Sequence, residues 1–161
     1  MMHQMINFKI GNMNEALAKE ILKWKYDPPY DFYNSNLNQD TLNELLNGSY
    51  DAVLTDEEIF GFFCTGESAQ VPSGHAVGAY EEPMVDMGLG MNPKYTGKGK
   101  GTAFCNFIIN CIQEKFPGVP IRLTVAIFNK RAIHLYKKLG FMEKGAFTTD
   151  QNVKFMTMIK K

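Results

Sequence analysis

Features of several common protein classes are missing from this sequence of 161 residues. The 17 lysines and arginines equal the 17 aspartates and glutamates, so nothing indicates the strong positive charge of a dedicated nucleic-acid binder. No apolar run approaches the roughly 20 residues of a membrane-spanning helix. With no internal repeat or low-complexity linker, and with 45% hydrophobic residues, we expect one domain over residues 1–161.

Cysteine is scarce and shows neither a metal pattern nor a disulfide pattern. Cys64, Cys105 and Cys111 all lie in apolar segments. An odd number of cysteines without a signal peptide favours reduced, packed thiols in a cytoplasmic protein. No cysteine–histidine cluster has zinc-ligand spacing, so we expect no metal.

Strand-like and helix-like patterns alternate along the first half of the chain. They predict a strand over 5–10, a helix over 13–24, a short helix over 42–46 and a hairpin of 52–54 with 59–64. Asn12, with Glu15 three residues later, is a candidate cap for the first helix. Residues 66–83 lack periodicity and read as a long loop.

The second half predicts the core of an α/β fold. A strand over 85–91, a helix after residue 101 and a strand over 121–127 form a crossover, which makes the two strands parallel. Residues 141–147 and 153–159 form a final antiparallel pair. Hairpins at both ends make the sheet mixed, with helices on both faces, a three-layer α/β/α domain.

A loop rich in glycine and lysine, residues 92–102, joins the strand over 85–91 to its helix. Glycines let the backbone approach a bulky anion, and the first N–H groups of a helix are unpaired and partly positive, so the loop predicts a phosphate cradle. The Walker pattern fails because neither Lys98 nor Lys100 is followed by serine or threonine. The dinucleotide pattern GxGxxG fails as well, because Thr102 and Phe104 stand where its last glycine belongs.

The loop Thr96-Gly97-Lys98-Gly99-Lys100-Gly101 resembles the acyl-CoA loop of the GCN5-related N-acetyltransferases, Arg/Gln-x-x-Gly-x-Gly/Ala. Pro93 and Tyr95 before it also resemble that family. Thr96 stands where arginine or glutamine is usual. The alternative interpretation is a glycine-rich turn with solvated lysines.

A second motif strengthens the resemblance. The family carries Asn-x-x-Ala-x-x-x-Tyr-x-x-x-Gly-Phe after its next strand, and Asn129, Ala132, Tyr136, Gly140 and Phe141 match every position. The two motifs stand in the family's order, and the firm resemblance covers residues 84–145. It implies a mostly antiparallel sheet splayed at the strand before the glycine loop.

The resemblance implies acetyl-CoA as donor and a set of residues that bind it. Main-chain groups would hold the pantetheine arm, the loop would hold the pyrophosphate, and the helix after residue 129 would complete the set: Leu89, Gly90, Met91, Thr96, Gly97, Lys98, Gly99, Lys100, Gly101, Thr102, Asn129, Ala132 and Tyr136. From the residues alone, Asn129 is an obvious helix N-cap, and both roles are compatible.

Tyr136 occupies the family's general-acid position, where its phenol would protonate the leaving thiolate. An unperturbed phenol has a pKa of about 10 and is protonated at neutral pH. The alternative is a half-buried tyrosine packed beside Ala132 and Leu139.

The general base is left open by the sequence. Asp86 lies on the strand where family members often carry a glutamate that acts through water, and a structural surface aspartate is the alternative. His75, Glu81 and Glu82 are fallback candidates that read equally as solvated groups.

An unusually aromatic connector, residues 24–33, follows the first helix. The resemblance places the acceptor pocket nearby, so Tyr26, Tyr30 and Tyr33 are candidate acceptor-binding residues. The alternative is a satellite hydrophobic cluster under a loop.

The expected function is transfer of the acetyl group of acetyl-CoA to a primary amine of a small molecule or peptide. One alternative is a non-catalytic acyl-CoA-binding module of the same fold, motivated by Thr96. Another is a phosphate- or nucleotide-binding protein of a different kind, motivated by Gly97–Gly101 alone. The resemblance also implies that two copies could pair through their late strands as a homodimer, while the identity of the acceptor stays open.

Overall fold

A computed structural model describes residues 6–56 and 58–161. Met5, in the strand predicted over 5–10, and Glu57, in the predicted hairpin turn, lie outside the described residues. The strands are β1 (Lys9–Asn12), β2 (Tyr50–Leu54), β3 (Ile59–Thr65), β4 (Val85–Met91), β5 (Ile121–Ala126), β6 (Met142–Thr148) and β7 (Lys154–Lys160). The helices are α1 (Glu15–Leu22), α2 (Gln39–Leu45), α3 (Gly101–Lys115) and α4 (Lys130–Lys138).

The sheet is mixed, as the sequence predicts. Its seven strands run in the order β1-β2-β3-β4-β5-β7-β6. β4 and β5 are parallel, whereas the pairs β1–β2, β2–β3, β5–β7 and β6–β7 are antiparallel. The β4–β5 ladder joins only Val85–Met87 to Ile121–Leu123, although β4 continues to Met91. This early end of the pairing is what the predicted splay of the sheet requires.

The chain forms two compact units. The first holds the described residues up to Cys64 together with Leu89–Phe107, and the second holds Thr65–Gly88 and Ile108–Lys161. Both β4 and α3 cross from one unit to the other. The expectation of a single domain stays a prediction.

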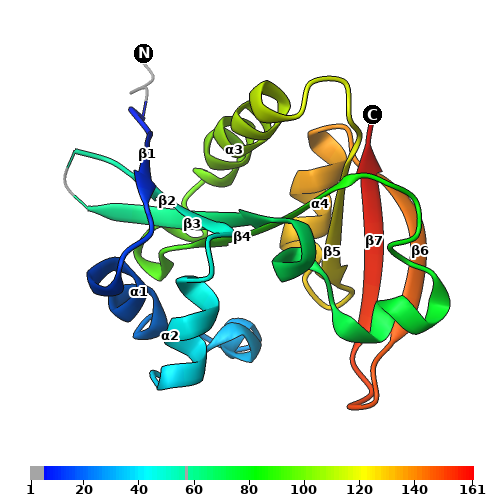
Figure 1. Ribbon diagram of the computed structural model, residues 1–161, viewed down its shortest axis with the longest axis horizontal. Coiled ribbons are helices and arrows are strands. Elements are labelled where there is room, and N and C mark those ends of the chain that lie inside the picture. Colours follow the sequence, from blue (N-terminus) through cyan, green and yellow to red (C-terminus); the bar gives the residue numbers. More distant parts are fainter. Residues whose placement is uncertain (1–5, 57) are drawn as a thin grey trace. The chain divides into compact units, whose positions relative to one another are not determined.

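In the first unit, α1 and α2 pack on one face of β2 and β3, and α3 begins on the other (Figure 1). The α1–α2 core contains Ala18, Ile21, Leu22, Leu45, Ala52 and Ile59. On the α3 side, the Phe104 ring lies 5.4 Å from that of Phe60. Opposite faces of β3 therefore bury neighbouring residues, which is the period-two pattern of a strand covered on both sides.

Asparagines cap α1 and α2. The expected cap Asn12 is wrong: Asn12 ends β1, and the Asn14 side chain accepts from Leu17 N–H at 2.9 Å. Helix α2 begins with a capping box in which Asn38 and Thr41 bond each other's backbone N–H groups. Both caps satisfy helix N–H groups that would otherwise lack partners.

Glycines allow β3 and β4 to approach closely. A Cβ atom at Gly61 would lie 2.5 Å from the Gly90 carbonyl oxygen, and one at Gly90 would overlap the Phe62 ring. The Phe62 side chain therefore fills the space beside Gly90. A register shift in the β2–β3 ladder leaves Phe60 without a partner on β2.

In the second unit, β5, β7 and β6 carry α4 on one face and the segment 65–84 on the other (Figure 1). The predicted long loop contains the 3₁₀ turns Gly66–Ala69 and Pro72–Val77. A Cβ atom at Gly74 in the second turn would lie 3.1 Å from the Phe147 ring of β6, so this turn packs directly on the strand. The layer opposite α4 is thus built from turns.

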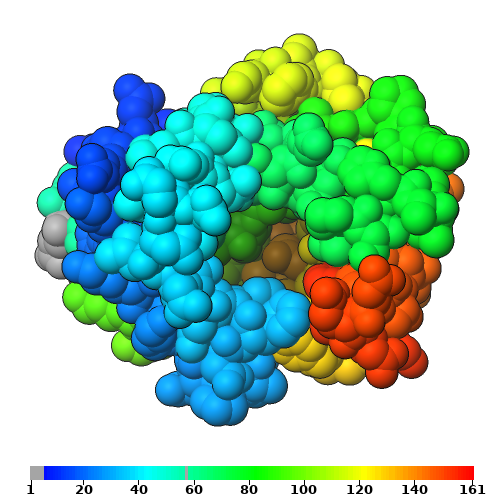
Figure 2. All heavy atoms as spheres, turned by 60° about the horizontal axis from the view of Figure 1, so that its bottom comes forward, coloured from blue at the N-terminus to red at the C-terminus, as the bar shows by residue number. Residues whose placement is uncertain are grey.

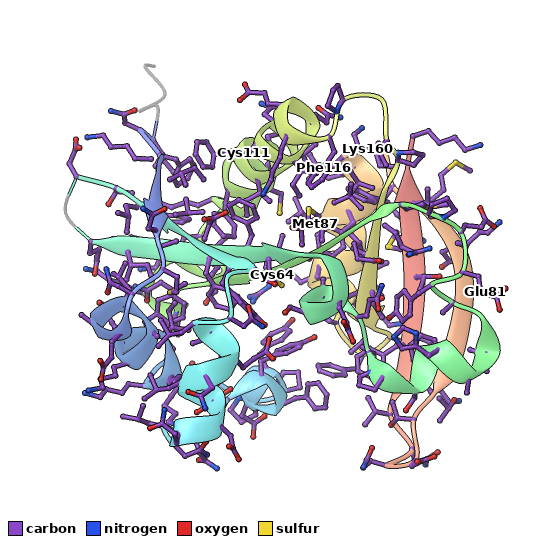
Figure 3. The ribbon with its side chains drawn as sticks, in the orientation of Figure 1. Cys64, Glu81, Met87, Cys111, Phe116 and Lys160 are labelled. Carbon is purple, nitrogen blue, oxygen red and sulfur yellow. The ribbon has the colours of Figure 1, made fainter. Side chains whose placement is uncertain are left out.

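The three cysteines are free thiols, as the sequence predicts, with Cys64 and Cys105 buried and Cys111 half-buried. Figure 3 shows Cys64 on β3 and Cys111 on α3. Burial raises the pKa of Cys105 to about 12, which leaves its thiol protonated and unreactive at neutral pH. Among the described residues, no helix is long and apolar enough to cross a membrane.

The close β3–β4 approach predicts that Gly61→Ala is strongly destabilising. Its new methyl group would lie 2.5 Å from a backbone carbonyl, which cannot rotate away, and overpacking of this kind costs about 1–3 kcal/mol. Urea denaturation should report the loss. The matched control is Gly145→Ala in β6, where the nearest atom lies 3.8 Å away. Equal stability of the two variants would contradict the close approach.

Candidate active site

The predicted site residues fall into two sets, one in each unit. The first unit holds Leu89–Met91, the glycine loop and the aromatic connector, and the second holds Asn129, Ala132, Tyr136 and Asp86. Each set has a geometry of its own, fixed by contacts inside its unit.

The glycine loop adopts a backbone that only glycine accepts readily. Gly97 and Gly99 have φ angles of 71° and 75°, in the left-handed region. No atom lies within 4 Å of a Cβ placed at Gly99, so the surface of the loop is open there. Helix α3 begins at Gly101, directly after the loop. This combination of turned backbone and helix start can present N–H groups to an anion.

Asn92 fixes the start of the loop to β3. Its side chain is 6% exposed and donates to the Ile59 carbonyl at 3.0 Å, while its backbone N–H donates to Phe60 at 2.8 Å. The same side chain accepts from the Lys94 N–H, which forms a tight turn. The loop therefore leaves the sheet in one defined direction.

A second anchor is a polar cluster of Glu58, Lys94 and Tyr95. The Glu58 carboxylate accepts from the Lys94 ammonium and from the Tyr95 hydroxyl, and these hydrogen bonds lower the pKa of Glu58. The Tyr95 ring stacks on Phe60 with centroids 4.4 Å apart, and the Lys100 ammonium lies 5.0 Å from the Tyr95 ring centroid. Lys98, by contrast, is exposed on the loop surface.

Thr96 has a local structural role at the position where the resembled family usually carries arginine or glutamine. Its hydroxyl donates to the Pro93 carbonyl at 2.9 Å and closes the 3₁₀ turn Pro93–Tyr95. A threonine side chain is too short to reach far beyond this turn. Support for the loop comes from Asn92 and from the Glu58 cluster.

The aromatic connector reaches β4 through Tyr26. The Tyr26 hydroxyl donates to the Met91 carbonyl at 2.7 Å, and its N–H donates to the Asn34 side chain at 2.7 Å. Burial raises the pKa of Tyr26 to about 12, so the hydroxyl stays a donor at neutral pH. Tyr30 and Tyr33 lie on the 3₁₀ turn Tyr30–Tyr33. Figure 2 shows blue and cyan residues of the connector and α2 gathered at the surface of the first unit.

In the second unit, Asn129 caps α4 as the sequence predicts. Its side chain accepts from the Ala132 N–H at 3.2 Å. Tyr136 is 8% exposed, and its ring meets that of Phe141 edge-on at 5.9 Å. The spacing of the second motif therefore sets the start of α4 and the burial of its tyrosine together.

Asp86 is engaged in a buried ion pair with Arg122. The carboxylate oxygens accept from Arg122 Nε at 2.7 Å and Nη2 at 2.9 Å, and Gln70 Nε2 donates to Oδ2 at 2.8 Å. Asp86 and Arg122 are each 3% exposed. A carboxylate held on both oxygens is poorly placed to accept a proton from substrate. The role of Asp86 as general base stays a prediction, and its contacts favour a structural role.

The fallback base candidates lie on the segment that covers β6 and β7. The His75 ring lies 5.1 Å from that of Tyr80, and Glu81 lies beside Gly78. Glu82 pairs with Lys144 across 3.7 Å. In the described part of the chain, no group of three or more histidine, cysteine, aspartate or glutamate side chains could hold a metal.

Sequence reasoning missed the residues that orient the site, namely Asn92, Glu58, Gln70 and Arg122. Asn92 carried a usable signal, since asparagine before proline typically starts a turn. The partners of Asp86 had none, because Gln70 and Arg122 lie 16 and 36 residues away along the chain.

The ion pair predicts that Asp86→Ala loses stability. Removing one partner leaves the Arg122 charge buried and uncompensated, which costs about 3–5 kcal/mol. Urea denaturation should show this loss, and the double variant Asp86→Leu with Arg122→Met should recover much of it. If Asp86→Ala kept its stability and lost only catalytic rate, the structural role would be wrong.

Comparisons with known proteins identify the family and the fold. Residues 16–141 match the model of the acetyltransferase (GNAT) family. A search of curated protein sequences found no match.

Three similar solved structures show the fold. A chimera of the spermidine N-acetyltransferase SpeG from Vibrio cholerae and hSSAT has a TM-score of 0.68 at 18% identity, over 95% of this chain and 94% of that one. Aminoglycoside N(6')-acetyltransferase from Legionella pneumophila has a TM-score of 0.65 at 22% identity, over 98% of this chain and 93% of that one. AAC(6')-Ib, solved with ribostamycin and coenzyme A, has a TM-score of 0.70 at 16% identity, over 96% of this chain and 93% of that one. With the family match over most of its length, the chain belongs to the GNAT acetyltransferase family.

Proposed function

We propose that this protein transfers the acetyl group of acetyl-CoA to a primary amine by direct attack. One observation carries the proposal: a chain of the GNAT family has an open loop with two left-handed glycines at the start of α3. The comparisons support an acetyltransferase fold. Donor, acceptor and residue roles are proposals.

The donor would be held by main-chain groups of β4, by the glycine loop and by α4. Residues 96–102 would bind the pyrophosphate through backbone N–H groups, with Lys98 and Lys100 supplying positive charge. Leu89, Gly90 and Met91 would hold the pantetheine arm, and Asn129 and Ala132 would contact it from α4. The open space at Gly99 fits this role, since a side chain there would cover the loop.

Tyr136 would act as general acid. Its hydroxyl would donate a proton to the departing thiolate as the thioester bond breaks, and would recover a proton from solvent afterwards. The attacking amine must be neutral, and acetyl-CoA supplies an acyl group already activated as a thioester. Asp86 is retained as candidate base, although its ion pair favours amine deprotonation by water or by another group.

A small-molecule amine is the favoured acceptor. Two of the similar structures are named for spermidine and aminoglycosides, and both compounds carry primary amines. The connector residues Tyr26, Tyr30 and Tyr33 would contribute aromatic surface for a cationic amine. A peptide amine is the alternative, and a homodimer is compatible with either acceptor.

Tyr136→Phe tests the proposed acid. Loss of the proton donor should lower kcat by roughly 100-fold or more, because general acid catalysis contributes about 10²–10⁴. Thiol release from acetyl-CoA should be followed with a panel of polyamines, aminoglycosides and peptides. The matched control is Tyr50→Phe, whose hydroxyl bonds Glu44 in the first unit.

Thermal melts combined with the thiol-release assay separate the alternative functions. A thermal shift with acetyl-CoA but not with ATP or NAD, followed by Tyr136-dependent thiol release, would support the proposal; ligand at 100 times its Kd stabilises by about 2.7 kcal/mol. A shift without turnover on any amine would instead indicate a non-catalytic acyl-CoA-binding module. Stabilisation by ATP or NAD alone would overturn both.

Tyr26→Phe tests the link between connector and β4. The variant removes one hydrogen bond to the Met91 carbonyl, worth about 0.5–1.5 kcal/mol. We expect acetyl-CoA to bind up to roughly tenfold more weakly, with kcat little changed, because the strand proposed to hold pantetheine loses an anchor. Calorimetric titration should measure the change. Donor affinity equal to that of Tyr50→Phe would contradict this positioning role.

A further inference from the structure

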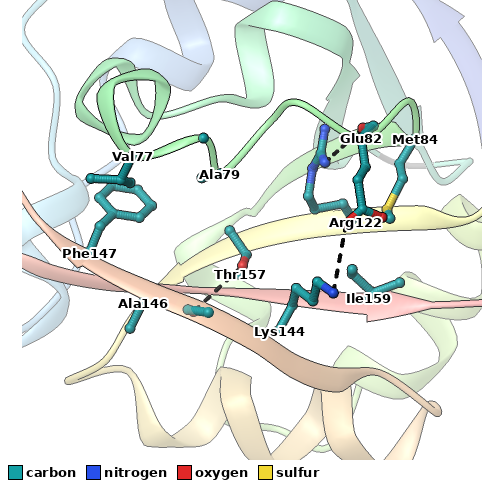
Figure 4. A pocket seen from close by; sticks show the side chains of 12 residues that line it. Val77, Ala79, Glu82, Met84, Arg122, Lys144, Ala146, Phe147, Thr157 and Ile159 are labelled. Carbon is teal, nitrogen blue, oxygen red and sulfur yellow. Dashed lines mark hydrogen bonds and ion pairs between the residues drawn. The ribbon is translucent and has the colours of Figure 1, made fainter.

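The second unit contains a cavity of about 230 Å³ between the segment 77–84 and strands β5, β7 and β6 (Figure 4). Polar side chains, Arg122, Glu82 and Lys144, line one part of it. Apolar side chains, including Val77, Phe147 and Ile159, line another. The volume equals that of roughly eight waters of liquid, which suits a ligand of amino-acid size.

Arg122 is a positively charged residue of the cavity lining, and hydrogen bonds hold its side chain in place. Three of its five N–H donors are used, two on Asp86 and one, from Nη1, on the Glu82 carbonyl at 3.0 Å. The guanidinium carbon also lies 5.1 Å from the Tyr80 ring centroid. Two N–H donors therefore lack a protein acceptor among the described residues. Because the side chain is already locked, a ligand that accepts from it would cost little side-chain entropy.

Lys144 is brought to the cavity by an irregularity in β6. The β6–β7 ladder pairs Glu143 with Met158 and then Gly145 with Thr157, so Lys144 has no partner on β7. Bulges of this kind re-aim side chains at functional positions. The Lys144 ammonium lies 3.7 Å from the Glu82 carboxylate, and both side chains are more than half exposed, at 58% and 63%. Exposed pairs are weak, so a ligand can separate them.

The apolar part of the cavity is open to solvent. Val77 is 64% exposed and Phe147 is buried. Figure 4 shows the two side chains next to each other. A ligand that covered Val77 would remove apolar surface from water. The cavity thus combines a polar end with an apolar end.

We propose that this cavity binds a free α-amino acid with a branched aliphatic side chain. Its carboxylate would pair with Lys144 and the free donors of Arg122, its ammonium with Glu82, and its side chain would lie against Val77 and Phe147. Arg122 and Lys144 balance Asp86 and Glu82 in formal charge. A zwitterion preserves this balance, whereas a ligand with one charge leaves a charge unmatched.

Calorimetric titration of the full chain, without acetyl-CoA, tests the ligand class. The probes are L-leucine, 4-methylpentanoate, which lacks the ammonium, and 3-methylbutylamine, which lacks the carboxylate. Leucine should bind, and each analogue should bind at least roughly tenfold more weakly, because charge-assisted bonds are lost. No binding of leucine, or equal binding of all three probes, would overturn the proposal.

Variants locate the site. Lys144→Met and Glu82→Gln should each weaken leucine binding by roughly tenfold. Lys154→Met is the control, since Lys154 is an exposed lysine of β7 outside the cavity lining. Wild-type affinity in both cavity variants would also overturn the proposal. Tyr136 does not line the cavity, so Tyr136→Phe should bind leucine with the wild-type affinity even if it has lost acetyl transfer. Failure of the proposed acetyl transfer is therefore distinguishable from failure of leucine binding.

Discussion

The buried ion pair of Asp86 and Arg122 holds three parts of the second unit together. It joins the paired ends of β4 and β5, and it draws in Gln70 and the Glu82 carbonyl from the covering segment. Such a pair contributes little net stability, because the desolvation of two charges offsets most of their attraction. The pair instead fixes an arrangement: without it, the 65–84 segment would lose the contacts of Gln70 and of the Glu82 carbonyl, and would keep that of Tyr80 with Thr124.

The same ion pair determines which chemical roles Asp86 and Arg122 can have. Asp86 stands where the resembled family often places a base, yet both of its oxygens accept hydrogen bonds from fixed donors. Arg122 in turn has three of its five N–H donors engaged and is one of the residues that line the cavity. The ion pair therefore weakens the argument for Asp86 as general base. It also holds the Arg122 guanidinium rigidly in the lining of the cavity.

Local chemistry made much of the fold predictable from sequence. Apolar periodicity located β4, β5, α3 and the final hairpin, and Asn129 was recognised as the cap of α4 because an N-cap acts over three residues. The first cap was misplaced because Asn12 and Asn14 both precede apolar residues at helical spacing, and only the end of β1 decides between them. The packing of Phe62 against Gly90 could not be predicted in this way, because the two residues come from different strands.

Long-range partners account for what the sequence left open at the site. Motif spacing identified the glycine loop and α4 from the sequence. The contacts that anchor the loop, however, join residues far apart in sequence, such as Tyr26 with Met91 and Asn92 with Ile59. These contacts give the Thr96 substitution a physical interpretation. Asn92, Glu58 and Tyr95 already fix the loop to β3, so its geometry does not depend on a long side chain at position 96. Only the charge of an arginine is missing, and Lys98 and Lys100 can supply charge from the same loop.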